Sequence, residues 1–284
     1  MNESKVFPKK SLGQNFLIDS NIARKIVESS GIQPGDFVLE IGPGKGALTK
    51  FLIECSIFYV GIEVDKNLIP LLNEFKEKNK NIFFEILCGD FLLFDEEHWV
   101  NEFGQKIFLL GNIPYSLSSP ILFKLLDRRQ FYKKAIMMVQ REVANRIVAI
   151  PGTKDFSILS VLIQTFANAR KLFDVSPRCF FPAPKVFSSV ISIEFKNEFL
   201  SDERYPIFKE IVKLAFNQRR KMISNSLFKR LGLNVDTCGN DPNLSFFVSK
   251  RAEELSFNDF LHLVDLLISR FPNNVKVFDR GNRL

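Results

Sequence analysis

The segment Asn112-Ile113-Pro114-Tyr115 combines residue types that can hold an amino group beside a flat heterocycle. It follows the apolar run Ile107–Gly111, which is typical of a buried parallel strand whose carboxyl end meets the ligand site. The asparagine amide oxygen and the isoleucine carbonyl could accept two hydrogen bonds from one amine. The proline stiffens the loop, and the tyrosine ring can stack on a base. The segment predicts methyl transfer to an exocyclic amine such as adenine N6, with an ordinary strand-to-helix turn as the alternative.

A glycine-rich turn, Gly42-Pro43-Gly44-Lys45-Gly46, follows a predicted strand at Phe37–Ile41 and leads into a helix that ends near Cys55. Glycines let the backbone approach a ligand, and the helix start supplies unpaired N–H groups. Glu63 ends the next predicted strand about 20 residues later, where an acid can bind ribose hydroxyls. The pattern therefore predicts a cofactor that carries a ribose, either S-adenosylmethionine or a nicotinamide dinucleotide.

Two acids favour S-adenosylmethionine over the dinucleotide. Glu40, just before the first glycine, would repel a pyrophosphate but tolerate a sulfonium-bearing amino acid. Asp90, after a predicted strand at Ile82–Leu87, can accept a hydrogen bond from an adenine amino group. Tyr205 and Lys209 have the spacing used by short-chain dehydrogenases, but they follow the last predicted strand. We interpret this spacing as a coincidence, but the glycine turn still leaves an oxidoreductase open as the alternative.

Composition restricts the class of protein. The 284 residues are 46% hydrophobic and 25% charged, which suits one large domain or a main domain with a smaller one. No apolar run approaches the ~20 residues of a membrane helix, and Met1–Lys10 lacks an apolar signal core, so we expect a cytoplasmic protein. Two histidines and four separated cysteines predict neither a metal site nor a Ser-His-Asp triad. The net charge of +7 favours a polyanionic partner.

Strand and helix patterns alternate over the first two thirds of the chain, which predicts βαβ units around a mostly parallel sheet. Beyond Lys196 only helical periodicity continues, so we place a domain boundary near 196–202. The further predicted strands are Phe58–Glu63, Ala135–Gln140, Leu172–Val175 and Val186–Phe195. The further predicted helices are 21–29, 67–78, 120–127, 141–149, 159–166, 205–231 and 257–271.

Two other segments suit a nucleic acid. The segment Phe180-Phe181-Pro182-Ala183-Pro184-Lys185-Val186 could supply a second stacking face opposite Tyr115, and stacking on an aromatic ring is worth about 1–3 kcal/mol per base. The alternative is a loop that its phenylalanines anchor in the core. Gln218-Arg219-Arg220-Lys221, with Lys229 and Arg230, spreads cations over most of a helical turn and suits a phosphate surface. A solvated helix face is the alternative there.

Taken together, these segments are similar to the small-subunit ribosomal RNA adenine N6,N6-dimethyltransferases, the KsgA/RsmA family. The resemblance covers nearly the whole chain. Its most specific parts are Gly13-Gln14-Asn15-Phe16-Leu17 and Gln218–Lys221, whereas Asn112–Tyr115 is shared with other amino-group methyltransferases. The resemblance implies an α/β fold with a Rossmann-like seven-stranded methyltransferase sheet, mainly parallel with one reversed strand, and a small all-helical C-terminal domain.

The resemblance also implies domain and site assignments. Residues 1–198 would form the S-adenosylmethionine-dependent methyltransferase domain, with 1–20 as a basic lead over the cofactor site, and 199–284 a helical RNA-binding domain. Asn112, Ile113, Pro114 and Tyr115 would form the catalytic segment, and Tyr115 and Phe180 would sandwich the target base. The implied cofactor contacts are Asn15, Leu17, Gly42, Gly44, Glu63, Asp90 and Asn112. The implied RNA contacts are Arg219, Arg220 and Lys221.

The activity that the resemblance implies is dimethylation of two adjacent adenosines near the 3′ end of 16S rRNA, late in small-subunit assembly. S-adenosylmethionine would be the methyl donor and the assembling small ribosomal subunit the partner, and we expect a monomer without a metal. Two alternatives remain open. One is a large-subunit rRNA adenine methyltransferase of the erythromycin-resistance type, and the other is a largely non-catalytic ribosome assembly factor.

Overall fold

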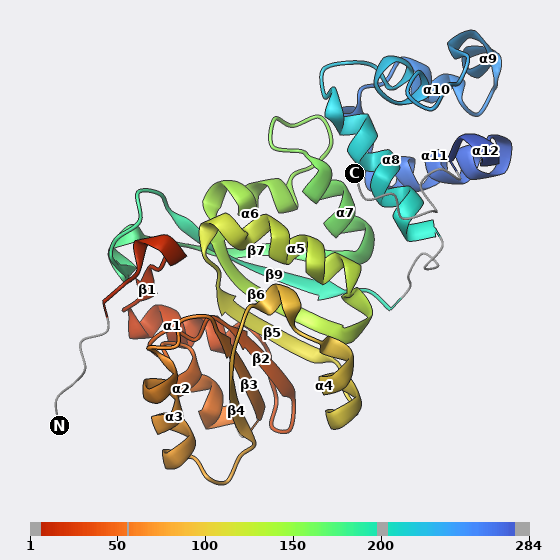
Figure 1. Cartoon of the computed structure of the whole chain (residues 1–284). Helices are drawn as coiled ribbons and strands as arrows, with labels where there is room; N and C mark the ends of the chain where they lie inside the picture. The colour runs from red at the N-terminus through yellow and green to blue at the C-terminus, as the bar shows by residue number, and fades with distance from the viewer. Residues whose placement is uncertain (1–6, 56, 198–203, 276–284) are drawn as a thin grey trace. The chain divides into compact units, whose positions relative to one another are not determined.

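The computed structural model describes residues 7–55, 57–197 and 204–275 (Figure 1). The chain divides into two compact units, Met1–Ala144 with Asn168–Phe195, and Asn145–Ala167 with Lys196–Leu284. The boundary predicted between residues 198 and 199 lies outside the described residues, as do residues 1–6 of the predicted lead. Within the described ranges, no helix is both long and apolar enough to cross a membrane.

A seven-stranded sheet organises the first unit, with the strand order β4-β3-β2-β5-β6-β9-β7 (Figure 1). The five strands β4, β3, β2, β5 and β6 run parallel to one another, whereas β9 is antiparallel to β6. The prediction of a methyltransferase-like α/β sheet with one reversed strand is therefore confirmed. The strands are β2 (Phe37–Ile41), β3 (Phe58–Glu63), β4 (Phe84–Cys88), β5 (Ile107–Asn112), β6 (Tyr132–Gln140), β7 (Ala167–Val175) and β9 (Ser188–Phe195).

Helices of the first unit pack their apolar stripes on this sheet. In α1 (Ser20–Glu28), the Asp19 side chain caps the first turn, and apolar residues three and four positions apart face the core. Helices α1 and α2 (Thr49–Leu52) together bury apolar side chains against one face of the sheet. The other helices that follow strands of this sheet are α3 (Ile69–Lys78), α4 (Glu96–Phe103), α5 (Ser118–Asp127) and α6 (Arg141–Val148), of which α6 belongs to the first unit only as far as Ala144.

The register of the parallel strands determines where their connecting turns lie. Ile41 of β2 pairs with Ile62 of β3 and with Gly111 of β5, and Glu63 pairs with Cys88 of β4. These residues are all at or next to the carboxyl ends of their strands. The turns that follow the four strands therefore meet at one edge of the sheet, as parallel pairing requires.

Several elements differ from the sequence predictions. The strand predicted at 172–175 begins at Ala167, because the charged residues that hide its pattern are exposed along an edge strand. Helix α4 is not predicted, although Asp95 caps its start and Gly104 ends it with φ 65°. A two-stranded antiparallel sheet of β1 (Phe16–Leu17) and β8 (Phe180–Phe181) is also not predicted, because its strands are too short to show a period.

The second unit is helical in its described part, and it includes a helix that the sequence analysis placed in the first domain. The ring of Phe166, at the end of α7 (Ile158–Phe166), contacts Tyr205 and Phe208 of α8 (Arg204–Asn217). This tertiary packing, which has no local sequence signal, joins α7 to the C-terminal helices. The remaining helices are α9 (Val235–Asn240), α10 (Ser245–Val248), α11 (Phe257–Arg270) and α12 (Pro272–Val275).

The helix predicted over 205–231 is interrupted. Helix α8 ends at Asn217, and a separate π-helical turn covers Ser224–Phe228. Between them Met222 forms an isolated β-bridge with Arg251, which competes with the helical hydrogen bonds. The basic residues after Gln218 therefore lie in a turn and not along one helix.

One carboxyl group is buried inside the sheet. Glu40 of β2 is 1% exposed, and its Oε2 accepts hydrogen bonds of 2.7 Å from the Tyr59 hydroxyl and 2.7 Å from Thr49 Oγ1. Burial, opposed by these two bonds, raises the pKa of Glu40 from 4.5 to about 7. The neutral acid is therefore the favoured form of this group in the folded protein at mildly acidic pH.

We expect the Glu40→Gln variant to remove part of the pH dependence of folding. Because folding raises this pKa, the contribution of Glu40 to stability is fully present below pH 4.5 and is lost as pH rises through about 7. The shift corresponds to roughly 3 kcal/mol in the free energy of unfolding. Urea unfolding across this range should show the wild type losing stability relative to the variant. Parallel curves would contradict this account of Glu40.

Candidate active site

A cavity of about 330 Å³ lies in the first unit, where the turns after the parallel strands meet. Its volume is in the range of small-molecule sites. The turns after β2, β3, β4 and β5 all contribute to its walls, together with the N-terminal lead. The predicted site residues that line it are Asn15, Gly42, Gly44, Glu63, Asp90, Asn112, Ile113, Pro114 and Tyr115. The structure thus brings together residues spread over about a hundred positions of the chain, as Asn15 and Asn112 are separated by 97.

The side-chain amide of Asn112 is held in one orientation. Its Nδ2 donates a 2.9 Å hydrogen bond to the main-chain oxygen of Asn15. Because a carbonyl oxygen can only accept, the amide nitrogen must face the lead, and Oδ1 points the other way. The next peptide is also fixed, since the N–H of Ile113 donates to the Met138 oxygen at 3.1 Å. The half-buried Asn112 therefore offers the cavity an acceptor.

Tyr115 is anchored at its hydroxyl. The Tyr115 oxygen lies 2.8 Å from Ser188 Oγ on β9, and burial raises the pKa of the phenol above its usual value. The Pro114 carbonyl accepts from the N–H of Leu117 at 2.9 Å, which closes a tight turn around the ring. The half-buried ring of Tyr115 is thus held at the cavity wall without titrating near neutral pH.

Phe180 lies in a different environment from the one predicted. Its side chain is 3% exposed, packs in the hydrophobic core and does not line the cavity. The cause is the pairing of β8 with β1, in which Phe180 is opposite Leu17. Its stacking on a target base stays a prediction. The neighbouring Phe181, 57% exposed, faces outward from the same strand.

The glycine turn and Glu63 form one hydrogen-bonded unit. Glu63 is 4% exposed; its Oε2 accepts from the Gly44 N–H at 3.0 Å and its Oε1 from the Asp65 N–H at 2.9 Å. Burial raises its pKa, against the two backbone hydrogen bonds. Gly42 has φ 61°, and a methyl group added there would meet no protein atom within 4 Å. The site therefore combines an open backbone cradle with a buried carboxyl group that has acceptor capacity left.

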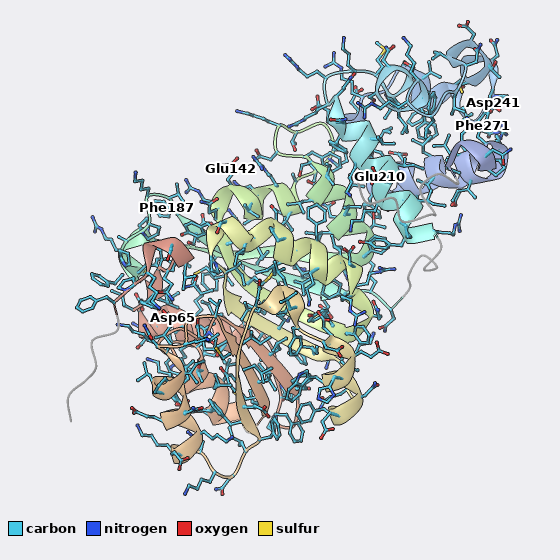
Figure 2. The ribbon with its side chains drawn as sticks, in the orientation of Figure 1. Asp65, Glu142, Phe187, Glu210, Asp241 and Phe271 are labelled. Carbon is cyan, nitrogen blue, oxygen red and sulfur yellow. The ribbon has the colours of Figure 1, made fainter. Side chains whose placement is uncertain are left out.

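Asp65 fastens the N-terminal lead beside this unit (Figure 2). Its carboxyl group accepts from Lys9 Nζ at 2.6 Å, Gln14 Nε2 at 3.3 Å and the Asn67 N–H at 3.0 Å. Burial opposes its ionisation, but these bonds outweigh burial and hold the pKa of Asp65 below its usual value. Sequence analysis misses Asp65, although an acid two positions after Glu63 in a ligand-binding turn is a usable signal.

Three other expectations need adjustment. Leu17 is buried and lines a smaller cavity of about 30 Å³, together with Glu40 and Gly42, and not the main one. Glu40 is bound to Tyr59 and Thr49, so its supposed repulsion of a pyrophosphate is not supported. The exposed Asp90 caps a turn, because its Oδ1 accepts from the Leu92 N–H at 2.9 Å and only part of its carboxylate remains for a ligand.

The basic residues of the second unit do not behave alike. Arg219 donates from Nε to Glu253 at 2.5 Å and from Nη2 to the main-chain oxygens of Thr153 and Lys154 at 3.2 and 2.6 Å. Its guanidinium is therefore bound to protein acceptors, and an RNA contact by Arg219 stays an unsupported prediction. Arg220 and Lys221 are exposed, and their contact with RNA stays a prediction.

The residues of the dehydrogenase-like spacing do not form a catalytic pair. Tyr205 is 8% exposed, and its ring packs edge-on against Phe166 at 5.3 Å between centroids. The Nζ of Lys209 lies 5.7 Å from the centre of the same tyrosine ring. These contacts belong to the core and surface of the helical unit, so the spacing gives no support to an oxidoreductase.

Comparison with known proteins agrees with this geometry. The model of the family described as ribosomal RNA adenine dimethylase matches residues 7–267. The chain is 39% identical over 277 residues to the "Ribosomal RNA small subunit methyltransferase A" of Protochlamydia amoebophila (strain UWE25), covering 95% of this chain and 94% of that protein.

Two solved structures share the fold. A dimethyladenosine transferase from Plasmodium falciparum superposes with a TM-score of 0.75 and 26% identity, covering 91% of this chain and 98% of that one. The 23S rRNA methyltransferase ErmE superposes with a TM-score of 0.66 and 25% identity, covering 88% and 98%. The extent of the family match and the identity to a full-length relative lead to one conclusion: the chain belongs to the ribosomal RNA adenine dimethylase family.

Proposed function

We propose that this protein transfers methyl groups from S-adenosylmethionine to N6 of two adjacent adenosines near the 3′ end of small-subunit rRNA. The observation that carries the proposal is the orientation of Asn112, whose Nδ2 is bound to the Asn15 oxygen so that Oδ1 is left as an acceptor in a cavity that the glycine turn also lines. The small-subunit relative, matched over 95% of this chain, favours the small subunit as the source of the substrate. The product is N6,N6-dimethyladenosine, formed during ribosome assembly.

The hydrogen-bonding groups that line the cavity match those of S-adenosylmethionine. When bound, S-adenosylmethionine supplies an electrophilic methyl group. The remaining acceptor capacity of Glu63 suits ribose hydroxyls, and the free part of the Asp90 carboxylate suits an adenine amino group. Gly42 leaves space for the amino-acid end, since no side chain fills its cradle. These assignments rest on chemistry and position within one cavity.

The chain's contribution to the reaction is to position and polarise a poor nucleophile. The lone pair of adenine N6 is delocalised into the ring, so the amine reacts only if it becomes pyramidal. Asn112 Oδ1 and the Ile113 carbonyl can accept both N–H groups, which favours that geometry and stabilises the positive charge that develops. The Tyr115 ring, fixed through Ser188, supports the face of the base. No general base is needed, because the alkylated ammonium is acidic and loses its proton to water.

A second candidate is methylation of large-subunit rRNA, which the similarity to the 23S rRNA methyltransferase ErmE favours. The two are separated by incubating undermethylated small and large subunits with the protein and S-adenosylmethionine. Mass spectrometry of the digested rRNA should then find dimethyladenosine in 16S rRNA only. Dimethyladenosine in 23S rRNA alone would contradict the proposal, and no product in either would favour an assembly factor without catalysis.

We expect the Asn112→Ala variant to lose methyl transfer while it remains folded. Removing one preorganised acceptor at a developing charge typically lowers kcat by about 10²–10³-fold. Single-turnover transfer to undermethylated small subunits measures the effect. Asn101→Ala, an exposed asparagine on α4, is the control and should keep the wild-type rate. A rate for Asn112→Ala within a few-fold of wild type would remove Asn112 from its proposed role.

We expect the basic residues of the second unit to differ in role, with Arg220 and Lys221 binding RNA and Arg219 stabilising the fold. We expect the double variant Arg220→Ala/Lys221→Ala to reduce the slope of log affinity against log salt for rRNA by about 1.4–1.8, because two phosphate contacts are lost. Arg219→Ala should instead lower the melting temperature, since it removes an ion pair with Glu253.

Lys78→Ala/Lys80→Ala is the control for the double variant, because both lysines are exposed in the first unit. Filter binding over a salt series and thermal unfolding give the two readouts. An unchanged slope for Arg220→Ala/Lys221→Ala would exclude these two side chains from the phosphate surface.

A further inference from the structure

The loop around β8 exposes two phenylalanines that the proposed reaction does not use. Phe181 is 57% exposed and Phe187 is 42% exposed, although phenylalanine is a residue type that folding normally buries. Val186, between them in the chain, is 44% exposed. Phe187 lies at the surface of the first unit (Figure 2). The three exposed apolar residues lie within seven positions of the chain, and contiguous exposed apolar patches mark interaction sites.

The Phe187 ring and the backbone that carries Phe181 are held in place before any partner binds. The guanidinium carbon of Arg141 lies 4.8 Å from the centre of the Phe187 ring, and the Arg141 N–H donates to the Phe187 oxygen at 3.0 Å. Phe181 belongs to β8, where it pairs with Phe16 of β1, and Pro182 stiffens the chain that follows. A partner that stacks on the Phe187 ring would therefore lose little conformational entropy in ordering it, and the backbone around Phe181 is already ordered.

Each ring is directly connected to the wall of the candidate active site. Phe187 precedes Ser188, whose Oγ binds the Tyr115 hydroxyl at 2.8 Å. Phe16, the strand partner of Phe181, lines the main cavity. Phe187 is thus connected to the cavity-lining Tyr115 through Ser188, and Phe181 is connected to the cavity-lining Phe16 through strand pairing.

Cations accompany the exposed rings. Arg141, Arg178 and Lys185 are all exposed. Among the residues that the structure describes, neither Arg178 nor Lys185 forms a salt bridge. Exposed aromatic rings interleaved with unpaired cations are the combination that single-stranded nucleic acids require, because each nucleotide offers a flat base and a phosphate. A protein partner with an apolar surface would have no need of these positive charges.

We propose that Phe181 and Phe187, with Arg141 and Lys185, form a stacking platform for the nucleotides that flank the target adenosine in single-stranded rRNA. Bases next to the extruded adenine stack on the two rings, and their phosphates contact the two cations. The platform rests on the proposed function, and it adds how the enzyme holds the RNA around its target. It also accounts for the exposure of the two phenylalanines.

The test is the double variant Phe181→Ala/Phe187→Ala, assayed on undermethylated small subunits and on a short RNA that contains the two adjacent adenosines. Loss of stacking at two bases should raise KM for RNA by about 30-fold or more, with the Kd for S-adenosylmethionine unchanged. With 2-aminopurine placed beside the target adenosine, the wild type should quench its fluorescence and the double variant should not. Phe187→Trp should keep the wild-type KM and quenching, because it retains a stacking face.

Phe58→Ala is the matched control, because this phenylalanine is 37% exposed at the start of β3, at the edge of the sheet opposite to the cavity-lining turns. If the wild type is active and the double variant has the same KM and the same quenching, the platform is overturned and the proposed function is left intact. A higher KM on subunits without any change on the short RNA would overturn it as well, by assigning the surface to a ribosomal protein. A wild type that quenches 2-aminopurine but methylates neither substrate would contradict the proposed function alone.

Discussion

The hydrogen bond from the Asn112 amide to the Asn15 carbonyl is the contact on which the candidate active site depends. It joins the N-terminal lead to the end of β5 and at the same time decides which way the amide oxygen points. Asp65 supports this arrangement, because its bonds to Lys9 and Gln14 hold the lead in place. The two anchors together explain why a lead with little regular structure can form one wall of a binding cavity.

The parallel register of four strands provides the second constraint. It places the glycine turn, Glu63, Asp90 and Asn112 at one edge of the sheet, so that groups far apart in the chain line one cavity. Burial of carboxyl groups accompanies this placement, since the pKa values of Glu40 and Glu63 are both raised. Such groups are costly for folding, and the backbone or hydroxyl donors to these two carboxyl groups reduce the cost.

The sequence predicts the parts of this structure that depend on local pattern. The bounds of β2 and β3 agree with the predicted strands, and the cavity residues at strand ends follow from parallel pairing alone. Phe180 and Arg219 differ from their predicted environments because both depend on distant partners. Strand β1 pairs with the strand of Phe180, and Glu253 binds Arg219 from 34 positions away. For the same reason no local signal indicates that α7 packs with α8, or that Lys9 binds Asp65 from 56 positions away.

The central claim concerns two oxygens, Asn112 Oδ1 and the Ile113 carbonyl, as acceptors for one amino group. A structure of the protein with S-adenosylhomocysteine and an RNA that contains the target adenosines measures this most directly. The account predicts N6 of the bound adenine at hydrogen-bond distance from both oxygens, about 2.7–3.2 Å, with the Tyr115 ring against the base. An adenine whose N6 faces away from both oxygens, or one bound outside the cavity, would contradict it.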